Sequence, residues 1–443
     1  MRKKYLVISI MFVCMLTTTA MAEEKEWSQL VPEKAGGNII DSLAEGSSWD
    51  AELGIQFREN VTDEIEGEGE DVEAGWGYLE FGWESGSVHG LQLGVGGLAI
   101  TELWYGEVSE GLFDNGGDFG RHERWTEAYI KYSLPNTKTH FILGRADDGK
   151  FGEPVAGDGD YYQGIGVTIK DIPRITIKAH AVNAWLNDAS ASWDMDGIQS
   201  DWQDMDDVVR DEGGIESDVG DFAYTLMTEI NAVDNFLTVT PYVQYHKDVA
   251  TSLGTSFNAE SVLRESLTVG LDGAYVKHFE DTPDAASATD EDVSQRALYA
   301  YGKFKNLKLG IGYYGISDDI PIFNTKSEGG DDFEDVFIMD EFDPMEQDLA
   351  KYGETQGNDT FYIDAGYSYG PFDLEVAYGW CKNAVVQDAW NRDGEATELN
   401  VILGFDITEN LKGELAYVSL SDDYTGDKDR SMDYVAGSLA YKF

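Results

Sequence analysis

Cysteine is almost missing from this sequence, with 2 in 443 residues, which excludes a disulfide scaffold and a thiolate zinc cluster. Basic residues are also scarce: 31 Lys and Arg stand against 84 Asp and Glu, for a formal net charge of -53. Because binding to phosphate backbones needs basic patches, this balance argues against nucleic acid as a partner. An aromatic content of 12% is too high for a disordered acidic tail.

Long apolar runs are absent too. A helix needs roughly 18 or more consecutive apolar residues to span a bilayer, and no segment has them, so we expect no transmembrane helix.

The N-terminus has the pattern of an export signal. Arg2, Lys3 and Lys4 precede an apolar stretch over 5–16, and Ala20 and Ala22 form a small-residue cleavage site. The sequence therefore predicts a signal peptide over 1–22 and a mature chain that keeps a single cysteine, as expected in an oxidising compartment.

The rest of the chain alternates apolar and polar residues with a period of two. One example carries Leu399, Val401, Leu403 and Phe405 on one face, with Asn400 on the other. This is the signature of a β-strand with one apolar face.

The connections separate a membrane barrel from a soluble sandwich. Short ones alternate with long acidic ones, and aromatic residues gather at the ends of the apolar faces. Outer-membrane barrels have short periplasmic turns, long extracellular loops and aromatic girdles, which is this pattern. The predicted short turns are 84–86, 135–137, 171–173, 234–235, 305–306, 370–371 and 409–410.

The strand count follows from parity. A first pass finds an odd number of strands, whereas a closed bacterial barrel needs an even one. A further strand over 255–263, ending in a turn at 264–266, repairs the count to 18; 16 strands is the alternative. The expected strands are 48–58, 72–84, 87–104, 123–134, 138–146, 161–171, 174–185, 221–233, 236–247, 255–263, 266–279, 294–304, 307–316, 360–369, 372–381, 397–407, 411–420 and 432–443.

These elements predict an all-β transmembrane antiparallel barrel over 47–443, preceded by an N-terminal periplasmic segment over 23–46. Such a barrel is too wide for side chains to fill, so we expect an aqueous channel. The long segments 188–221 and 317–359 carry much of the negative charge. They form either a solvated outer face or a negative field at the pore mouth that attracts cations. The segment 194–197 lacks the ligand spacing of a calcium loop, and no metal site or cofactor is expected.

Alternation predicts which charged side chains face the lumen. The inward acids are Glu52, Glu80, Glu127, Asp272, Asp364, Asp373, Glu375, Asp406 and Glu414. The residues predicted to line the pore are Arg58, Glu127, Lys131, Lys178, Lys303 and Lys308.

The first part of the barrel carries several short motifs in a definite order. They are Asp41-Ser42-Leu43-Ala44, Glu127-Ala128-Tyr129-Ile130-Lys131-Tyr132, Leu143-Gly144-Arg145, Pro154, Tyr162-Gln163-Gly164 and Asp171-Ile172-Pro173. Their order resembles that of the OprD-like family of substrate-selective outer-membrane porins. The resemblance covers 41–187 and implies an 18-strand barrel whose third extracellular loop folds inward as a constriction.

By position, that loop is 146–160 here. The residues that would line or flank the constriction are Arg145, Asp147, Asp148, Lys150, Glu153, Asp158 and Asp160. Members of the family that take up carboxylates line the path with basic residues, whereas this loop holds one base and five acids. An acidic rim favours cationic or neutral solutes.

We therefore predict a porin for passive diffusion of small hydrophilic solutes, with a preference for cationic or neutral ones. A structural or adhesive surface protein and a polysaccharide-export barrel are the alternatives. None of the six histidines lies in a recognisable nucleophile motif, so no enzyme is expected. The expected partners are the lipid bilayer, lipopolysaccharide, the permeating solutes and the barrel-assembly machinery, which would recognise the terminal Phe443; a homo-oligomer is left open.

Overall fold

A computed structural model of the chain describes most of the predicted barrel. The described residues are 43–44, 46–63, 73–105, 122–151, 161–186, 203–204, 222–246, 250–264, 266–280, 294–316, 359–384, 394–423 and 430–443. The predicted signal peptide and nearly all of the predicted periplasmic segment lie outside these ranges and remain predictions. Of the two long acidic segments, 188–221 and 317–359, only 203–204 and Asp359 are described. Among the described residues, no helix is both long and apolar enough to cross a membrane.

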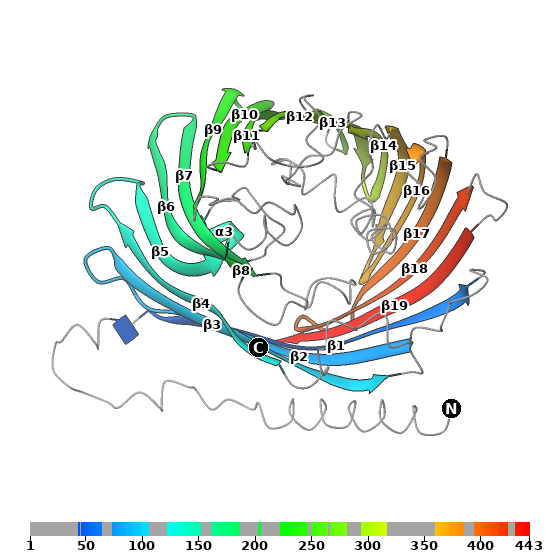
Figure 1. Cartoon of the computed structure of the whole chain (residues 1–443), viewed down its shortest axis with the longest axis horizontal. Helices are drawn as coiled ribbons and strands as arrows, with labels where there is room; N and C mark the ends of the chain where they lie inside the picture. The colour runs from blue at the N-terminus through cyan, green and yellow to red at the C-terminus, as the bar shows by residue number, and fades with distance from the viewer. Residues whose placement is uncertain are drawn as a thin grey trace.

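The strands form one antiparallel sheet that closes on itself (Figure 1). Closure is made by the first and last strands, which pair from Glu52 opposite Lys442 to Asp63 opposite Met432. The strands are β1(Ser48–Asp63), β2(Glu73–Glu84), β3(Leu91–Tyr105), β4(His122–Ser133), β5(His140–Asp147), β6(Tyr161–Ile172), β7(Ile175–Leu186), β8(Gln203–Asp204), β9(Ala223–Val233), β10(Leu237–His246), β11(Ala250–Arg264), β12(Leu267–Glu280), β13(Ser294–Phe304), β14(Leu307–Ile316), β15(Asp359–Tyr369), β16(Phe372–Ala384), β17(Gly394–Asp406), β18(Leu411–Asp423) and β19(Arg430–Lys442).

One of these nineteen strands is not a wall strand. β8 has 2 residues and pairs only with the end of β7, while β7 continues its main pairing with β9. The wall therefore has eighteen strands, as predicted, and the alternative of sixteen is wrong. The strand added on parity grounds is β11, which pairs with β12 from Ala250 to Arg264 and with β10 from Ala250 to Ala259.

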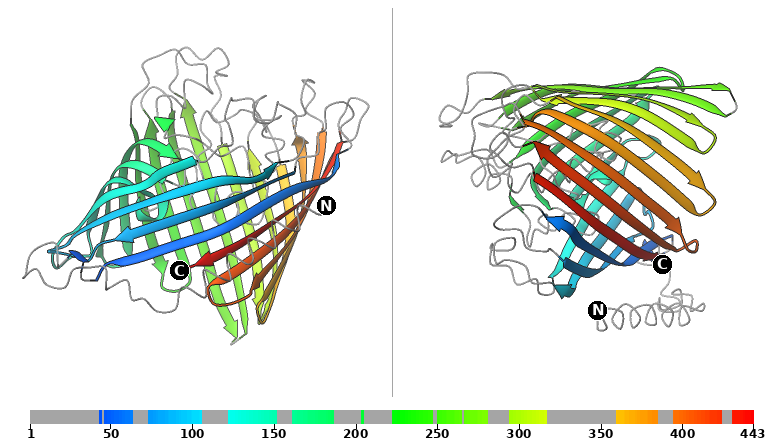
Figure 2. Two further views of the ribbon diagram at one scale, coloured as in Figure 1. Left: turned by 90° about the horizontal axis from the view of Figure 1, so that it is seen from below. Right: turned by 90° about the vertical axis from the view of Figure 1, so that its right-hand side faces the viewer.

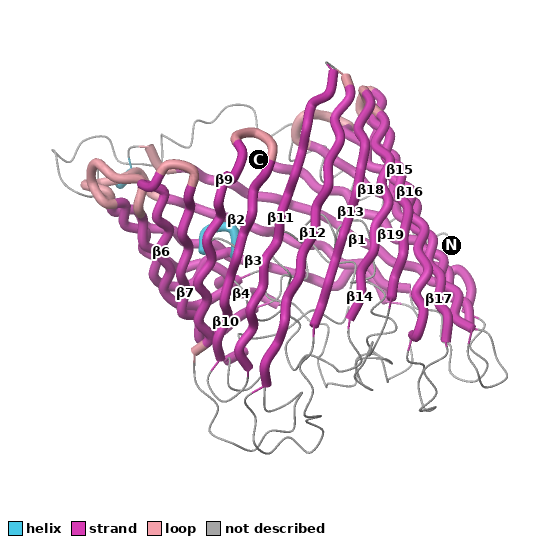
Figure 3. Tube along the Cα trace, turned by 90° about the horizontal axis from the view of Figure 1, so that it is seen from above, coloured by secondary structure: helices cyan, strands magenta, loops and turns pink. Residues whose placement is uncertain are grey.

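The wall strands are tilted, so strands on different sides of the barrel cross one another in the side views (Figure 2). Short turns join alternate pairs of strands at one end of the barrel, which is also the end where the chain terminates (Figure 3). Several of these turns need a left-handed residue, and Asn136 (φ 60°), Asn235 (φ 56°) and Gly370 (φ 61°) supply it. Asn and Gly adopt this conformation at low cost.

The predicted strand over 87–104 begins too early. The residues Val88 and Leu91 form a bridge around His89 and Gly90, which have φ values of 53° and 88°. The chain therefore turns through these positions, and β3 starts only at Leu91. Alternation alone could not show where β3 starts, because the residue types at 87–90 occur both in tight turns and at strand ends.

Glycine positions let aromatic rings lie flat on the inner wall. A Cβ added to Gly94 would lie 2.1 Å from the Tyr129 ring, and one added to Gly312 would lie 1.9 Å from the Tyr362 ring. Each ring thus occupies the space that a side chain on the neighbouring strand would need. Apolar side chains such as Leu143, Ile311 and Leu309 point the other way and are exposed, as a lipid-facing surface requires.

Candidate functional site

Charged side chains from β4, from the end of β5 and from the segment after β5 come together inside the barrel. On β4, Glu127 and Tyr129 are buried at 7% and 3% exposure, whereas the alternate residue Ile130 is 45% exposed. Alternation therefore directs Glu127 and Tyr129 to the lumen side. At the end of β5 the chain leaves the wall and forms the short helix α3(Asp148–Phe151), which lies within the ring of strands (Figure 1).

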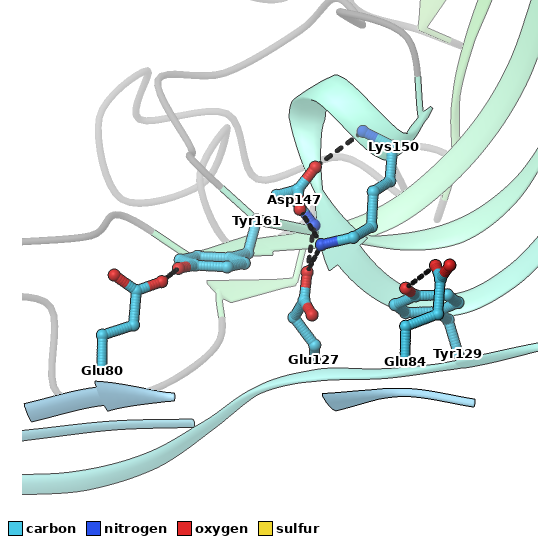
Figure 4. A network of polar contacts seen from close by, with 7 residues as sticks. All are labelled: Glu80, Glu84, Glu127, Tyr129, Asp147, Lys150 and Tyr161. Atoms are coloured by element: carbon cyan, nitrogen blue, oxygen red, sulfur yellow. Dashed lines mark hydrogen bonds and ion pairs between the residues drawn. The ribbon is translucent and has the colours of Figure 1, made fainter. Parts of the chain in front are cut away.

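Lys150 on α3 is held by two carboxylates. Its Nζ forms ion pairs with Glu127 on β4 and with Asp147 at the end of β5 (Figure 4). The backbone N–H of Lys150 also donates to Oδ1 of Asp147 at 2.6 Å, and the backbone N–H of Asp147 donates to Glu127 at 3.4 Å. The ammonium lies 5.6 Å from the centre of the Tyr129 ring. We call these four residues the Lys150 cluster.

The cluster holds the Lys150 pKa above its usual value. Burial acts to lower this pKa, but the charge of Asp147 and the hydrogen bonds to Asp147 and Glu127 outweigh burial and raise it. The ammonium of Lys150 therefore stays charged at neutral pH.

An apolar contact also attaches α3 to the wall. Phe151 is 1% exposed and packs in a group with Ile142, Tyr162 and Val182 of the wall. Its ring meets the ring of His180 edge-on, with 6.3 Å between centres. The segment that leaves β5 is thus attached to the wall by both an ionic and an apolar contact.

Tyrosine hydroxyls fix further carboxylates around the lumen. Tyr129 of the Lys150 cluster donates to Glu84 at 2.8 Å, and Tyr161, beside the cluster, donates to Glu80 at 2.9 Å (Figure 4). The same pairing recurs elsewhere on the wall: Tyr78 with Glu52 at 2.7 Å, Tyr299 with Asp364 at 3.0 Å and Tyr301 with Glu260 at 2.8 Å. A hydrogen bond donated by a tyrosine hydroxyl keeps the accepting carboxylate in place.

The group in Figure 4 carries an excess of negative charge. It contains the carboxylates of Glu80, Glu84, Glu127 and Asp147 against the single ammonium of Lys150, so one positive and four negative charges give a formal total of -3.

The residues predicted for the constriction are only partly described. Glu153, Asp158 and Asp160 lie outside the described residues, as does the side chain of Asp148. The structure joins Asp147 and Lys150 through the cluster. Arg145 instead contacts the neighbouring strand, where its Nε donates to Oε1 of Gln163 at 2.7 Å.

The residues predicted to line the pore fall on different parts of the wall. Glu127 belongs to the Lys150 cluster, and the half-buried Lys131 and Lys178 lie on β4 and β7. Lys303 and Lys308 lie over tyrosine rings, 4.8 Å from Tyr301 and 5.2 Å from Tyr299. The side chain of Arg58 is outside the described part.

Sequence reasoning missed the tyrosine partners and the role of Glu84. Alternation placed tyrosines at strand ends, where they predicted a girdle, and gave no sign that some of them face inward. Several inward tyrosines have a glycine opposite on a neighbouring strand, as Tyr129 has Gly94, whereas Tyr161 lies opposite Asp147 and Leu186. That cross-strand signal appears only once the register is known. In the described part of the chain, no group of three or more His, Cys, Asp or Glu side chains could hold a metal ion.

Known structures share this fold. OccK9 (OpdG) of Pseudomonas aeruginosa superposes with a TM-score of 0.68 at 15% identity, covering 91% of this chain and 100% of that one. OpdK of the same organism has a TM-score of 0.66 at 13% identity, covering 90% and 99%. OprD, also from P. aeruginosa, has a TM-score of 0.63 at 12% identity, covering 91% and 96%.

Sequence comparison identifies the family. No curated protein matches the sequence of this chain. The sequence pattern of a family described as Campylobacter major outer membrane protein, however, matches residues 97–441, which is most of the barrel. With the closed eighteen-strand wall and the charged lumen, this match shows that the chain belongs to that family of porins and is a protein of the Gram-negative outer membrane.

Proposed function

We propose that the chain is a passive channel for small hydrophilic solutes that favours cationic and neutral ones, with the segment 146–160 forming the constriction. The observation that carries this proposal is the state of Lys150. It is the one base of that segment, and two carboxylates neutralise it, so it offers little attraction to an anionic solute. The remaining acids beside it, Glu80 and Glu84, leave the region negative.

The placement of α3 supports a constriction here. α3 lies inside the ring of strands, and its contacts through Phe151 and Lys150 hold it to the wall. A segment attached in this way narrows the lumen on the β4–β6 side. Fixed carboxylates at a narrow, poorly screened place act on ions more strongly than the same charges at an open rim.

Two fold relatives have been solved with anionic compounds, OpdK with vanillate and OccK2 (OpdF) with glucuronate. Both compounds are carboxylates, which basic side chains attract. In the present chain, the lysine of α3 is already paired with two carboxylates. We therefore expect it to exclude such solutes relative to cationic solutes of equal size.

Swelling of proteoliposomes tests this proposal. Vesicles containing the refolded protein are diluted into isotonic arabinose, lysine hydrochloride or sodium glutamate, and the swelling rates are compared. The account expects arabinose and lysine to enter faster than glutamate. Faster entry of glutamate would overturn the preference, and no swelling in any solute would favour a structural or adhesive role.

Assembly in the membrane is proposed to depend on the C-terminal residue. The backbone N–H of Phe443 donates to the carbonyl of Ala51 at 2.9 Å, and its ring meets Tyr441 edge-on at 4.8 Å, so the end of the chain lies at the β1–β19 seam. Phe443→Ala is expected to reduce the amount of barrel in cells without preventing refolding in detergent.

The mass of the refolded protein under native conditions tests whether the chain forms a homo-oligomer.

A further inference from the structure

The outer surface of the barrel carries two cations where the apolar band ends. Alternation directs Lys277 on β12 and Arg296 on β13 outward, since Tyr275 opposite Arg296 is 47% exposed and Leu298 on the same face of β13 is 46% exposed. Lys277 lies three residues before the end of β12, and Arg296 lies two residues after the start of β13. These strand ends are opposite the short-turn end, so both cations lie at the extracellular side.

The two side chains are neighbours. Lys277 is opposite Ser294 and Tyr275 is opposite Arg296, so the two cations occupy diagonal positions of one antiparallel pair. Diagonal positions on one face lie about 7–8 Å apart, within reach of both side chains. A single anionic group of phosphate size can contact both.

Aromatic rings orient these cations. The Nε of Arg296 donates to the hydroxyl of Tyr313 at 2.8 Å, and its guanidinium carbon lies 5.5 Å from the centre of that ring. The Nζ of Lys277 lies 5.1 Å from the centre of the Phe279 ring. The bond to Tyr313 fixes the plane of the guanidinium, and a fixed guanidinium suits bidentate binding of phosphate oxygens.

The charge pattern of the surrounding wall is unusual for this chain. In the extracellular halves of β11 to β14, the described outward-facing positions hold no acidic residue, and these two cations are the only charged side chains there. In the whole chain, acids outnumber bases 84 to 31. Directly below lie Leu309 and Ile311, exposed at 53% and 59%, which face the acyl chains.

We propose that Lys277 and Arg296 bind a phosphate of an outer-leaflet phosphoglycolipid, the lipid A part of lipopolysaccharide. The lipid supplies both chemistries at the right depths, with acyl chains against the apolar band and phosphate at the level of the two cations. A free phosphate would use only the charge, and at physiological salt its attraction to an exposed pair is weak.

Native mass spectrometry of the detergent-refolded chain with bisphosphorylated lipid A tests the proposal. The K277Q/R296Q variant is expected to bind lipid A roughly tenfold or more weakly than the wild type, because it loses charge-assisted hydrogen bonds to phosphate. The K277R/R296K variant keeps both charges and is expected to retain most of the binding. The matched control is K303Q/K308Q, which removes two cations from the lumen side of β13 and β14. This control is expected to bind lipid A like the wild type.

Further arms of the experiment separate the sources of phosphate. Dephosphorylated lipid A is expected to bind the wild type as weakly as lipid A binds K277Q/R296Q, and millimolar inorganic phosphate is expected not to displace lipid A. The proposal would be overturned if the wild type and K277Q/R296Q bound lipid A equally, or if the wild type bound lipid A and dephosphorylated lipid A equally. Displacement of lipid A by inorganic phosphate would also overturn it. Folding of each variant is checked by its heat-dependent gel mobility, and K277R/R296K supplies a second comparison should the neutral variant not fold.

Discussion

At the residue scale, inward tyrosines combine two functions. The Tyr129 ring lies where a side chain on Gly94 would be, and its hydroxyl donates to Glu84 at 2.8 Å. The ring therefore fills the space between strands, while the hydroxyl fixes a negative charge at the lumen. Tyr78 and Tyr301 repeat this arrangement over Gly54 and Gly270, with Glu52 and Glu260 as acceptors.

Gly144 is a residue where substitution should be costly. Its φ is 124°, and an added Cβ would lie 2.2 Å from the carbonyl oxygen of Ala128, a backbone atom that cannot move aside. Gly144→Ala is expected to lower the free energy of unfolding by at least about 1–3 kcal/mol, the usual cost of such a backbone conformation. Urea unfolding in lipid vesicles, followed by tryptophan fluorescence, measures it.

The control for this substitution is Gly302→Ala. The nearest atom to its added Cβ is 4.0 Å away, so the methyl group meets no obstacle. We expect an unfolding midpoint close to that of the wild type. Equal midpoints for the two variants would show that the Gly144 backbone relaxes freely.

Charge changes within the Lys150 cluster should shift ion selectivity in opposite directions. Lys150→Met keeps the apolar stem and takes the formal charge of the Figure 4 group from -3 to -4, so cation preference is expected to rise. Glu127→Gln takes it from -3 to -2 and is expected to reduce the preference. The reversal potential under a KCl gradient reports both. Shifts in the same direction would indicate that loss of the ion pair with Lys150, and not the change in charge, controls the ion selectivity.

The raised pKa of Lys150 sets the pH range of the contact. A lysine whose folded pKa lies above its unfolded value of 10.5 contributes stability that is complete below that pH. The contribution is lost as the pH rises through the folded pKa. Open-channel current noise is therefore expected to increase as the pH rises above about 10.5, but not in Lys150→Met. The same noise increase in Lys150→Met, or none in the wild type, would contradict this view of the contact.

At the element scale, α3 is the part on which the proposed constriction depends. It begins where β5 ends, after Gly144 turns the strand and Ala146 becomes fully buried. The ionic contact to β4 and the packing of Phe151 then hold α3 inside the ring.

Chemical modification at Gly149 tests the position of α3. This residue is exposed, and an added Cβ would lie 3.5 Å from Asp147, so a cysteine fits. In a Cys381→Ser background, Gly149→Cys treated with a bulky methanethiosulfonate reagent is expected to lose a large part of its conductance. Leu226→Cys, exposed at 48% on the outward face of β9, is the control and is expected to conduct as before. Equal effects at both positions, or none at Gly149, would place α3 outside the ion path.

The strands could be predicted from sequence because each shows a period of two that the barrel requires. Parity even located β11, whose alternation is weak, since a closed barrel does not accept an odd strand. The start of β3 and the inward tyrosines could not be predicted in this way. Both depend on contacts between strands, such as the Val88–Leu91 bridge and the register of Tyr129 against Gly94.

At the scale of the whole molecule, charge is distributed differently on the two faces of the wall. The lumen face holds the paired carboxylates and the Lys150 cluster, whereas the described outer face of β11 to β14 shows apolar residues and, at its extracellular side, Lys277 and Arg296. The first pattern suits the passage of cations through water, and the second suits contact with anionic lipid.

The reversal potential of the wild-type channel tests the central claim most directly. The refolded protein is placed in a planar bilayer of neutral lipid under a KCl gradient, and current is recorded until single openings are resolved. The account predicts open channels whose reversal potential has the sign of K⁺ selectivity, weakening as salt rises and screens the carboxylates. A folded barrel that passes no current, or one with the sign of Cl⁻ selectivity, would contradict it.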